Sequence, residues 1–450
     1  MATSNAAVRE RGAHARRDRT TLRPGHPAVL LSIAVGALLL CGLIMILSAS
    51  SVSSFATYGS SFLFFQRQML WAVVGLLCFA FFARLDYHRL SGFGYVIFPV
   101  VVGLLFAVLI PGVGVVSGGS ARWLSFGLFS FQPSEVAKLA LVLFAADVFS
   151  RKDESTFDSF SHTVLPLIPA LGILAALVML QPDLGTTLVL GAIGIGTLFV
   201  AGAPISFMSP IVTAGVVVTT IAALAEPYRR ARIFAFVNPW ADPFNTGYQT
   251  IQSLIAVGSG GWLGVGLGAS RQKWLYIPNA HTDFIYAILA EETGLLGTFV
   301  VLGLFGFLAY MGVRTARRAP DRFGMLLASG ITIWIALQAL VNIGAVIAAL
   351  PITGVPLPLV SFGGTSLVVV LVASGILVNI AYQAESGPPP RSRARRKPRP
   401  ARPRPQRSPR PTARTGARPP VRRRTPSAQP IRSVRRTRSA RPTRARGRSG

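Results

Sequence analysis

The chain has 450 residues, of which 51% are hydrophobic and 14% charged, and its mean hydropathy is +0.52. A water-soluble protein of this length carries far more charge, and repeated apolar runs of about 20 residues are long enough to cross a bilayer as helices. A soluble fold is therefore excluded, and an all-α integral membrane protein is predicted. Cys41 and Cys78 lie inside apolar runs, so we expect them to pack rather than to form a disulfide or bind a metal. The N-terminal region does not show the pattern of a cleavable signal peptide.

Most of the net charge of +29 lies at the end of the chain. The segment 391–450 holds 22 Arg, one Lys and no acidic residue, and it is rich in Pro and Ser. Such a segment cannot bury enough apolar surface to offset its chain entropy. The expected organisation is a disordered basic segment (1–25), a polytopic membrane domain (26–384) and a disordered Arg/Pro-rich tail (385–450).

Ten apolar segments are predicted to form spanning helices. Lys and Arg gather in three short connections at 84–89, 151–152 and 314–322, and positive charge in short loops marks the cytoplasmic side. Because ten is even, both termini are expected in the cytoplasm, and a large extracytoplasmic loop is expected between helices 7 and 8. The predicted helices are 28–48, 65–83, 92–110, 134–150, 164–180, 186–203, 207–225, 284–313, 325–349 and 363–383.

The polar motifs fall on the predicted outer face. They are ARW (121–123), QPDLGTT (181–187), the long loop 226–283 and the run 351–366. Loops presented by a rigid scaffold often carry function. ATP is absent on that side of the membrane, so any chemistry there needs a substrate that arrives already activated.

Several common mechanisms lack their motifs. The chain has no Walker loop and no HExxH, and His281 is the one histidine of five on the predicted outer face, so a histidine-based triad has little to draw on. Residues 264–269 read GVGLGA and match a dinucleotide fingerprint, but no strand, helix or soluble domain surrounds them. A glycine-rich turn explains that run better.

Asp283 is the main candidate for chemistry. It stands where the long outer loop enters the eighth predicted helix, so its carboxylate borders both water and hydrocarbon. Partial desolvation raises the pKa of a carboxyl toward a value that suits a general base. The alternative is a structural charge at the start of that helix, with Thr282 as its cap. Asp183, after a proline at another helix end, poses the same choice between a cap and a ligand contact.

Other charged residues lie at membrane depth, where an ionisable side chain needs a partner or a cavity. Glu291 is expected about 12 Å along the helix from Asp283, and at least one of Glu291 and Glu292 should contact another helix. Glu135 and Lys138 stand at positions i and i+3 of one helix. We expect these two to form an ion pair that shapes the site rather than reacts.

The long outer loop is unusually basic. Positive charge outside runs against the usual bias, so it indicates an anionic ligand such as a phosphate. The alternative is contact between the arginines and lipid headgroups. Residues 246–253 are predicted to lie along the interface as an amphipathic segment. The basic residues are Arg229, Arg230, Arg232, Arg271 and Lys273.

Four stretches together resemble the SEDS family (shape, elongation, division and sporulation proteins), over about residues 28–383. Residues 266–281 resemble its division-type members more than its elongation-type members. Residues 290–294 read AEETG where many members have GEELG, and both glutamates are kept. The stretches are PSEVAK (133–138), QPDLGTT (181–187), residues 232–297 and PITGVPLPLVSFGGTS (351–366).

The resemblance implies a peptidoglycan glycosyltransferase that polymerises lipid II together with a class B penicillin-binding protein. It places the family's essential acidic residue at Asp283, which would deprotonate the acceptor hydroxyl. Pyrophosphate is a good leaving group once Arg, Lys or a divalent cation such as Mg or Mn stabilises its charge. The substrate-binding candidates are Arg122 and Trp123 of the ARW motif, Glu135 and Lys138 of the PSE-xx-K motif, and Arg229, Arg232, Lys273, His281 and Ser361.

Other functions stay open at this stage. A lipid II flippase would use the polar residues at membrane depth as a transport path. An elongation-type polymerase or a scaffold that recruits proteins through its tail are further alternatives. For a division-type enzyme we expect the inner (plasma) membrane at the septum, with other division membrane proteins as partners. The basic tail should bind anionic lipid or an acidic partner.

Overall fold

The structure is a computed structural model that describes residues 25–117, 120–127, 129–152, 159–274, 276–278 and 280–386. The predicted disordered ends therefore lie almost entirely outside the described residues. The helices are α2 (Pro27–Tyr58), α3 (Leu63–Arg84), η2 (Tyr87–Leu90), α4 (Gly94–Val108), α5 (Pro133–Ser150), α6 (Phe160–Val164), α7 (Ile168–Leu180), α8 (Leu184–Ala201), α9 (Ile205–Ala225), α10 (Pro227–Val237), η4 (Pro239–Ala241), α11 (Tyr248–Ser259), α12 (Ile285–Arg318), α13 (Arg322–Val346) and α14 (Gly364–Ser386). The strands are β1 (Gly114–Ser117), β2 (Ser120–Phe126) and β3 (Phe129–Phe131).

Each of the ten predicted segments coincides with a helix, and the multi-pass helical class is confirmed. Seven helices in the described part of the chain are long and apolar enough to span a membrane, namely α2, α3, α8, α9, α12, α13 and α14. The helices α4 and α7 are apolar but shorter, and α5 carries three charged residues. The number of spans therefore stays a prediction. The predicted helix 164–180 corresponds to α7, which begins only at Ile168, after Pro166 has ended the short helix α6.

The bundle is built around α13 and α14. The most apolar windows of these two helices are 67% and 78% buried, whereas that of α9 is only 11% buried. The helix α14 packs against α2, α3, α12 and α13. Exposed apolar side chains on α9, such as Val216, Val218 and Ile221, are therefore the surface that this helix would present to lipid.

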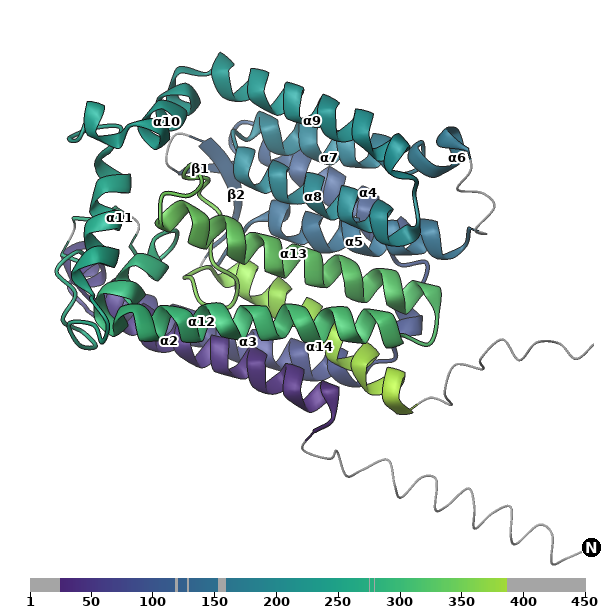
Figure 1. Ribbon diagram of the computed structural model, residues 1–450, viewed down its shortest axis with the longest axis horizontal. Coiled ribbons are helices and arrows are strands. Elements are labelled where there is room, and N and C mark those ends of the chain that lie inside the picture. The colour runs from purple at the N-terminus through teal and green to yellow at the C-terminus, as the bar shows by residue number, and fades with distance from the viewer. Residues whose placement is uncertain are drawn as a thin grey trace, which may run out of the picture. The chain divides into compact units, whose positions relative to one another are not determined.

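The two ends of the bundle differ. Figure 1 shows the start of α2 and the end of α14 at one end, and α10, α11, β1 and β2 at the other. We call the second end the loop end. An even number of crossings would place the first and last helices this way, as the sequence predicts.

A small antiparallel sheet at the loop end is the main departure from the all-α prediction. Its strand order is β1-β2-β3, and Trp123 of β2 is paired with Val115 of β1. Successive side chains of a strand point to opposite faces. The neighbours Arg122 and Trp123 therefore point to opposite faces of the sheet.

Residues 351–363 form a re-entrant segment that folds back into the bundle. Sequence analysis predicts an outer loop here, but Val355, Leu357 and Val360 are buried. Two glycines permit the close packing. A Cβ atom at Gly42 of α2 would lie 2.5 Å from the carbonyl oxygen of Leu359, and one at Gly185 of α8 would lie 2.6 Å from that of Thr353. Backbone without helical hydrogen bonds is tolerated at this depth only if protein groups satisfy it.

The helix α12 is broken near its start. Gly294 has φ +66° and ψ −166°, which interrupts the helical ladder of the predicted continuous helix 284–313. The loop before α12 satisfies the backbone groups that the break leaves free, so the first turns of α12 are fastened to it. The four bonds run from Val265 N to Glu291 O (3.0 Å), Gly266 N to Glu292 O (3.1 Å), Leu295 N to Gly261 O (2.9 Å) and Leu296 N to Trp262 O (3.2 Å).

Candidate active site

Asp283 lies at the loop end, immediately before α12. The helix begins at Ile285 with Phe284 as its N-cap, and no side chain forms a capping hydrogen bond there. The cap is thus Phe284 and not Thr282, which the structural alternative names. Its side chain is half-buried, and a Cβ atom at Gly354 of the re-entrant segment would lie 3.6 Å from its Oδ2. The carboxylate therefore faces the re-entrant segment.

The surroundings of Asp283 tune its ionisation. Burial raises the pKa of this carboxyl to about 6; Arg232 lowers it, Asp183 raises it and Arg122 lowers it, in that order of size. A carboxyl with such a pKa is mostly ionised at neutral pH and still basic enough to accept a proton. The predicted effect of partial desolvation is thus present at this residue.

The two arginines reach Asp283 from different elements. Arg122 of β2 donates through Nε to Gln181 O (3.0 Å) and through Nη2 to Pro182 O (2.7 Å). Arg232 of α10 donates through Nη1 to Ile352 O (3.4 Å) of the re-entrant segment. Two backbone carbonyls hold the guanidinium of Arg122 and one contacts that of Arg232, and both charges act on the carboxylate.

Asp183 serves as a helix cap. Its carboxylate accepts from the backbone N–H of Thr186 (2.9 Å) and from its hydroxyl (2.8 Å) at the start of α8. The residue before this cap, Pro182, offers the carbonyl that Arg122 Nη2 binds. Of the two roles that the sequence leaves open, the structure shows the cap.

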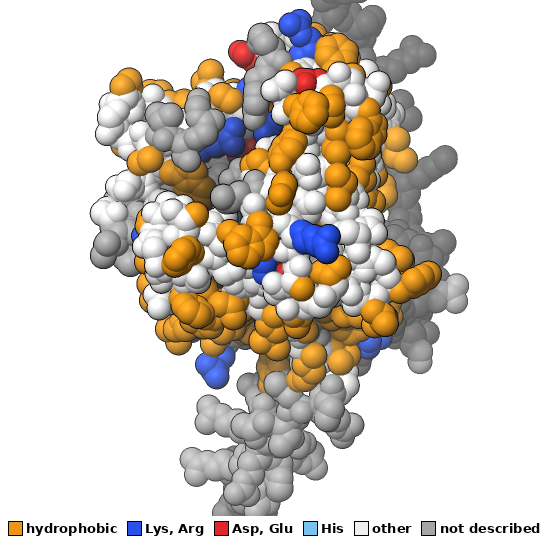
Figure 2. Space-filling view, turned by 90° about the vertical axis from the view of Figure 1, so that its left-hand side faces the viewer, with side chains coloured by type: hydrophobic (Ala, Val, Ile, Leu, Met, Phe, Trp, Pro, Cys, Tyr) orange, Lys and Arg blue, Asp and Glu red, His pale blue; other side chains and the backbone are white. Residues whose placement is uncertain are grey.

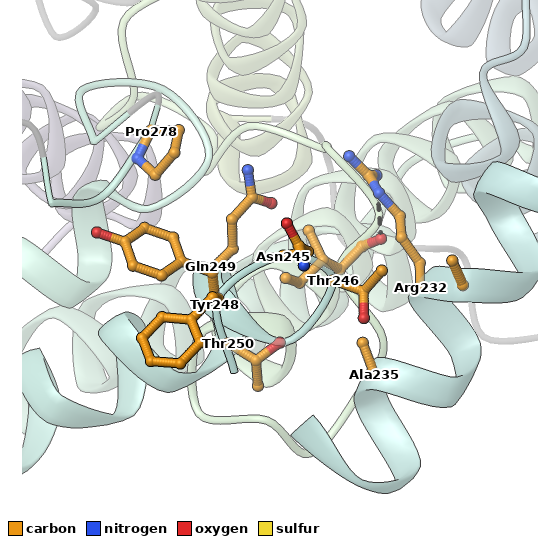
Figure 3. Close-up of a pocket in the computed structure, with 11 residues that line it drawn as sticks. Arg232, Ala235, Asn245, Thr246, Tyr248, Gln249, Thr250 and Pro278 are labelled. Atoms are coloured by element: carbon orange, nitrogen blue, oxygen red, sulfur yellow. Dashed lines mark hydrogen bonds between the residues drawn. The ribbon is translucent and has the colours of Figure 1, made fainter. Parts of the chain in front are cut away.

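A first cavity of about 360 Å³ lies beside Arg232. Figure 3 shows the side chains of Arg232, Asn245, Thr246 and Gln249 around it, between α10 and α11. Hydroxyl and carboxamide groups make up most of its polar lining, which suits a ligand rich in hydroxyl and amide groups. The full lining is Ala231, Arg232, Ala235, Phe244, Asn245, Thr246, Tyr248, Gln249, Thr250, Pro278 and Ile352.

A second cavity of about 280 Å³ is lined in part by His281 and Thr282, shortly before α12. Its lining is largely aromatic with one cationic side chain, and five of its eleven residues come from the start of α3 and from Trp123. Figure 2 views the loop end and shows basic side chains among hydrophobic ones around a hollow surface. The lining is Phe64, Arg67, Leu70, Trp71, Trp123, Ser130, His281, Thr282, Phe362, Gly363 and Gly364.

Residues shortly before α12 line both cavities. Pro278 lines the first cavity, whereas His281 and Thr282 line the second. Asp283 follows Thr282, and the charge of Arg232, which lines the first cavity, acts on its carboxylate. Asp283 thus lies next to residues of both cavities without lining either one.

His281 and Ser361 hold this segment in place. The ring of His281 stacks on Phe64 with centroids 4.9 Å apart, and burial lowers the pKa of this histidine to about 4, so it is neutral at pH 7. The hydroxyl of Ser361 donates to Thr282 O (2.6 Å) and accepts from Leu357 N (2.8 Å). Of these two predicted substrate-binding residues, His281 lines a cavity, whereas Ser361 is buried and holds the backbone of Thr282 and Leu357 together.

Glu135 and Lys138 form the predicted ion pair, at 2.8 Å from Nζ to Oε1. Both are buried, and Lys138 Nζ also donates to Gln338 Oε1 (2.8 Å) and lies 5.4 Å from the ring centre of Trp334. Neither residue lines a cavity described above. The pair lies inside the helix bundle, and its connection to Asp283 runs through α13.

Lys273 and Arg229 are directed away from Asp283. Lys273 is buried, and its Nζ lies 3.6 Å from Glu292 Oε1 and 3.4 Å from Ser48 Oγ of α2. Arg229 donates to Ala222 O (3.1 Å) at the end of α9. Two of the five basic residues named for the anion site thus have other partners, whereas Arg232 lines the first cavity.

The two glutamates of α12 also have partners, as predicted. Ser48 Oγ of α2 donates to Glu292 Oε1 at 2.5 Å, so Glu292 contacts another helix. Glu291 accepts from the backbone N–H groups of Arg271 (3.0 Å) and Gln272 (3.3 Å) and from the hydroxyl of Ser270. Both carboxylates thus fasten the long loop rather than face Asp283.

Among the described residues, no group of three or more His, Cys, Asp or Glu side chains gathers as metal ligands. The divalent cation that the sequence analysis expects stays a prediction, because such an ion can be held by one or two carboxylates and the phosphates of a substrate. The protein's own positive charge that acts on Asp283 comes from Arg232 and Arg122.

The sequence analysis missed two carboxamides on α13, Gln338 and Asn342, which bind the backbone around the site. A signal was available, because two amide side chains four residues apart in an apolar helix lie on one face. It also missed Arg67 as a cavity residue, since the sequence shows no contact between the start of α3 and the segment before α12.

The fold and the site together define a multi-pass membrane protein with a carboxylate-centred site at one end of its helix bundle. The chain belongs to the cell cycle protein family of FtsW, RodA and SpoVE, whose model matches residues 29–386. The family to which the sequence motifs point is thereby confirmed.

Relatives and solved structures agree. The chain is similar to stage V sporulation protein E of Bacillus subtilis (43% identity; 80% of this chain and 98% of the relative). It is also similar to the probable peptidoglycan glycosyltransferase FtsW of Thioalkalivibrio sulfidiphilus (42% identity; 80% and 90%). A chain of a peptidoglycan synthase complex that coordinates polymerization and crosslinking aligns with TM-score 0.64 (29% identity; 79% and 97%). Rod shape determining protein RodA of Thermus thermophilus aligns with TM-score 0.58 (26% identity; 78% and 96%).

Proposed function

We propose that this chain is a peptidoglycan glycosyltransferase that polymerises lipid II, with Asp283 as the general base. The observation that carries the proposal is a half-buried carboxylate with a raised pKa, two arginines whose charges act on it, and two cavities that are lined by neighbouring residues. Relatives that carry the name peptidoglycan glycosyltransferase support the reaction class.

The reaction needs one base and one stabilised leaving group. A hydroxyl oxygen of the acceptor sugar attacks the anomeric carbon of the donor sugar, and its proton passes to Asp283. The bond from that carbon to the pyrophosphate oxygen breaks, and its electron pair leaves with the polyprenyl pyrophosphate. A cationic side chain beside the pyrophosphate stabilises the leaving anion, and Arg67 of the second cavity is the candidate. No second carboxylic acid is required, in contrast to glycosidases.

The linings of the two cavities support an assignment of the two substrates. The aromatic cavity with Arg67 opens beside α3, whose apolar window is only 17% buried and so presents much of its surface outward. A prenyl chain with its pyrophosphate suits this lining, so we place the donor there. The amide- and hydroxyl-rich cavity beside Arg232 suits the sugar and peptide groups of the acceptor.

The partner and the location follow from the same reading. A peptidoglycan synthase complex among the similar structures supports a transpeptidase partner, for which a class B penicillin-binding protein is the candidate. The similarity to FtsW supports a division role at the septum, with both termini in the cytoplasm and the loop end outside. Other division membrane proteins would be further partners.

A transporter would use its polar residues differently. Glu135 and Lys138, two of the charged residues inside the bundle, are paired with each other and enclosed, which does not resemble an open path. The open polar surfaces lie at the loop end. Polymerisation by detergent-solubilised protein, where no two sides exist, separates the enzyme from a flippase.

The decisive experiment compares purified variants with labelled lipid II, with and without the transpeptidase partner. Asp283→Asn keeps the shape of the side chain and removes the base, so we expect polymer formation to fall by about 10²–10⁴-fold. The control is Glu226→Gln, an exposed acidic residue of the same loop. More than about a tenth of the parent rate in Asp283→Asn would contradict the proposal.

A further inference from the structure

We propose that Gln338 and Asn342 of α13 are positioning residues for this reaction. Their carboxamides hold the backbone of Asp283 and the re-entrant segment in one arrangement, and they connect the buried Glu135–Lys138 pair to the site. This inference rests on the proposed function, because it assigns these residues to the same reaction.

Asn342 connects the backbone at Asp283 to the re-entrant segment. Its Nδ2 donates to Asp283 O (2.8 Å) and to Val355 O (2.8 Å), and the residue is 2% exposed. Its Oδ1 is buried and accepts no hydrogen bond from the described residues. The side chain therefore acts as a double donor, and both of its acceptors are backbone carbonyls of the site.

Gln338 lies one helical turn before Asn342, and it binds the backbone of Pro356, the residue after Val355. Its Nε2 donates to Pro356 O (2.9 Å), while its Oε1 accepts from Lys138 Nζ (2.8 Å) and Trp334 Nε1 (2.7 Å). Accepting two hydrogen bonds fixes which end of the carboxamide faces the re-entrant segment. Lys138 thus orients Gln338, and Glu135 holds Lys138 in place.

The hydrogen bonds to the carbonyls of Val355 and Pro356 matter because the re-entrant segment shapes the site. Gly354 faces Asp283 Oδ2, and Ile352 O accepts from Arg232. The segment therefore sets the position of both the base and its nearest arginine. A displacement of about 1 Å in such a site costs roughly 100-fold in rate.

This arrangement explains why Glu135 and Lys138 belong to the site without touching substrate. They are enclosed in the bundle, and the hydrogen bonds run from Glu135 to Lys138, to Gln338 and to Pro356 O. Their predicted role in substrate binding becomes a positioning role, exerted on the backbone next to Asn342.

The first test is Asn342→Leu, which removes both donors and keeps a similar volume. We expect kcat to fall roughly 100-fold while KM for lipid II changes by no more than about threefold. The matched control is Asn379→Leu of α14, because Asn379 is also buried and donates to a backbone carbonyl, Ala83 O (2.9 Å), away from the site. That variant should lose thermal stability and keep its kcat.

The second readout is the pH profile. Looser packing lets water reach Asp283, so the acid limb of kcat/KM should move to lower pH in Asn342→Leu and stay unmoved in Asn379→Leu. The charged groups facing Asp283 are Arg232, Arg122 and Asp183, and neither substitution alters them. An unchanged kcat and acid limb in Asn342→Leu, with Asp283→Asn inactive, would overturn the inference and leave the proposed function standing.

The third test asks whether the Glu135–Lys138 pair and Gln338 affect kcat through the same chain of hydrogen bonds. Gln338→Leu and the double variant Glu135→Gln/Lys138→Met should each lower kcat, and their combination should lower it no further than the larger single effect. Losses that multiply would show that the pair acts by another route, and would overturn that part of the inference. An active Asp283→Asn enzyme, in contrast, would refute the proposed function itself.

Discussion

Two groups of charged side chains flank the first turns of α12, and they differ in enclosure. Glu292 is 1% exposed, accepts from Ser48 and lies 3.6 Å from Lys273 Nζ. Asp283 is half-buried beside two cavities, and its pKa is raised to about 6. An enclosed, paired charge holds chains together, whereas a partly solvated one can exchange a proton with a substrate. Enclosure, and not residue type, separates the two roles.

The largest expected effect is the dependence of activity on pH, which follows from the partly solvated Asp283. Because catalysis needs the ionised carboxylate and burial raises the pKa of Asp283 to about 6, activity should be constant above pH 7 and fall about tenfold per unit below pH 6. The measurement is kcat/KM for lipid II against pH, at each pH in a protein checked for folding. If kcat/KM of the parent enzyme did not fall between pH 7 and pH 5, the raised pKa of Asp283 would not control the rate.

The same pKa has a consequence for stability. A carboxyl whose pKa rises on folding stabilises the fold fully below its unfolded value, and this contribution is lost as the pH rises through the folded value of about 6. At pH 8 the ionised Asp283 is therefore a cost, and Asp283→Asn should unfold at a higher temperature than the parent. Thermal unfolding in detergent measures this, and the difference should shrink at pH 5.

The enclosed pair of Lys273 and Glu292 should affect stability rather than turnover. Lys273→Met leaves Glu292 buried without its cation, so we expect a loss of about 3–5 kcal/mol in the free energy of unfolding, with turnover per folded molecule little changed. The control is Arg271→Met, an exposed basic residue of the same loop. Adding Glu292→Gln to Lys273→Met should restore stability. If Lys273→Met were stable but slow, the enclosed group would belong to the active site.

A smaller effect is expected at the arginines. Arg232→Gln removes a cation beside Asp283 and the hydrogen bond to Ile352 O, so activity should fall by about 10–100-fold, in line with the loss of a charged hydrogen bond. Arg229→Gln is the matched control, because Arg229 lies on the same helix and binds Ala222 O. Equal losses in the two variants would point to α10 as a whole rather than to Arg232.

The smallest effect is expected from the tail, which lies outside the described residues. A chain that ends after Ser386 keeps Glu385, which pairs with Arg318 (2.8 Å) at the end of α12. It should turn over lipid II in detergent at the parent rate with the same partner and lose localisation in cells. Ending at Gln383 removes Glu385 and should cost some stability. Loss of turnover in the well-folded chain ending after Ser386 would make the tail part of the catalytic machinery.

Much of the helical layout could be predicted, because long apolar runs cross a bilayer as helices whatever their neighbours are. The pair Glu135–Lys138 was predictable too, since residues at i and i+3 meet on one helix face. The sheet β1-β2-β3 was not, because its short strands lie between loop residues without a regular alternation. The break at Gly294 was also missed, since the loop that satisfies it lies about 30 residues earlier in the chain.

The sequence by itself determined the membrane class, the family and Asp283 as the candidate base, because local composition and short motifs carry that information. Only the tertiary structure decided which charges belong to the site. Lys273 and Arg232 look alike in the loop, yet one is enclosed with Glu292 and the other lies beside Asp283. The same holds for Asn342, which becomes a site residue because the re-entrant segment folds back against α13. The physical reason is that the pKa of a carboxyl and the reach of a hydrogen bond depend on distances between segments far apart in the chain.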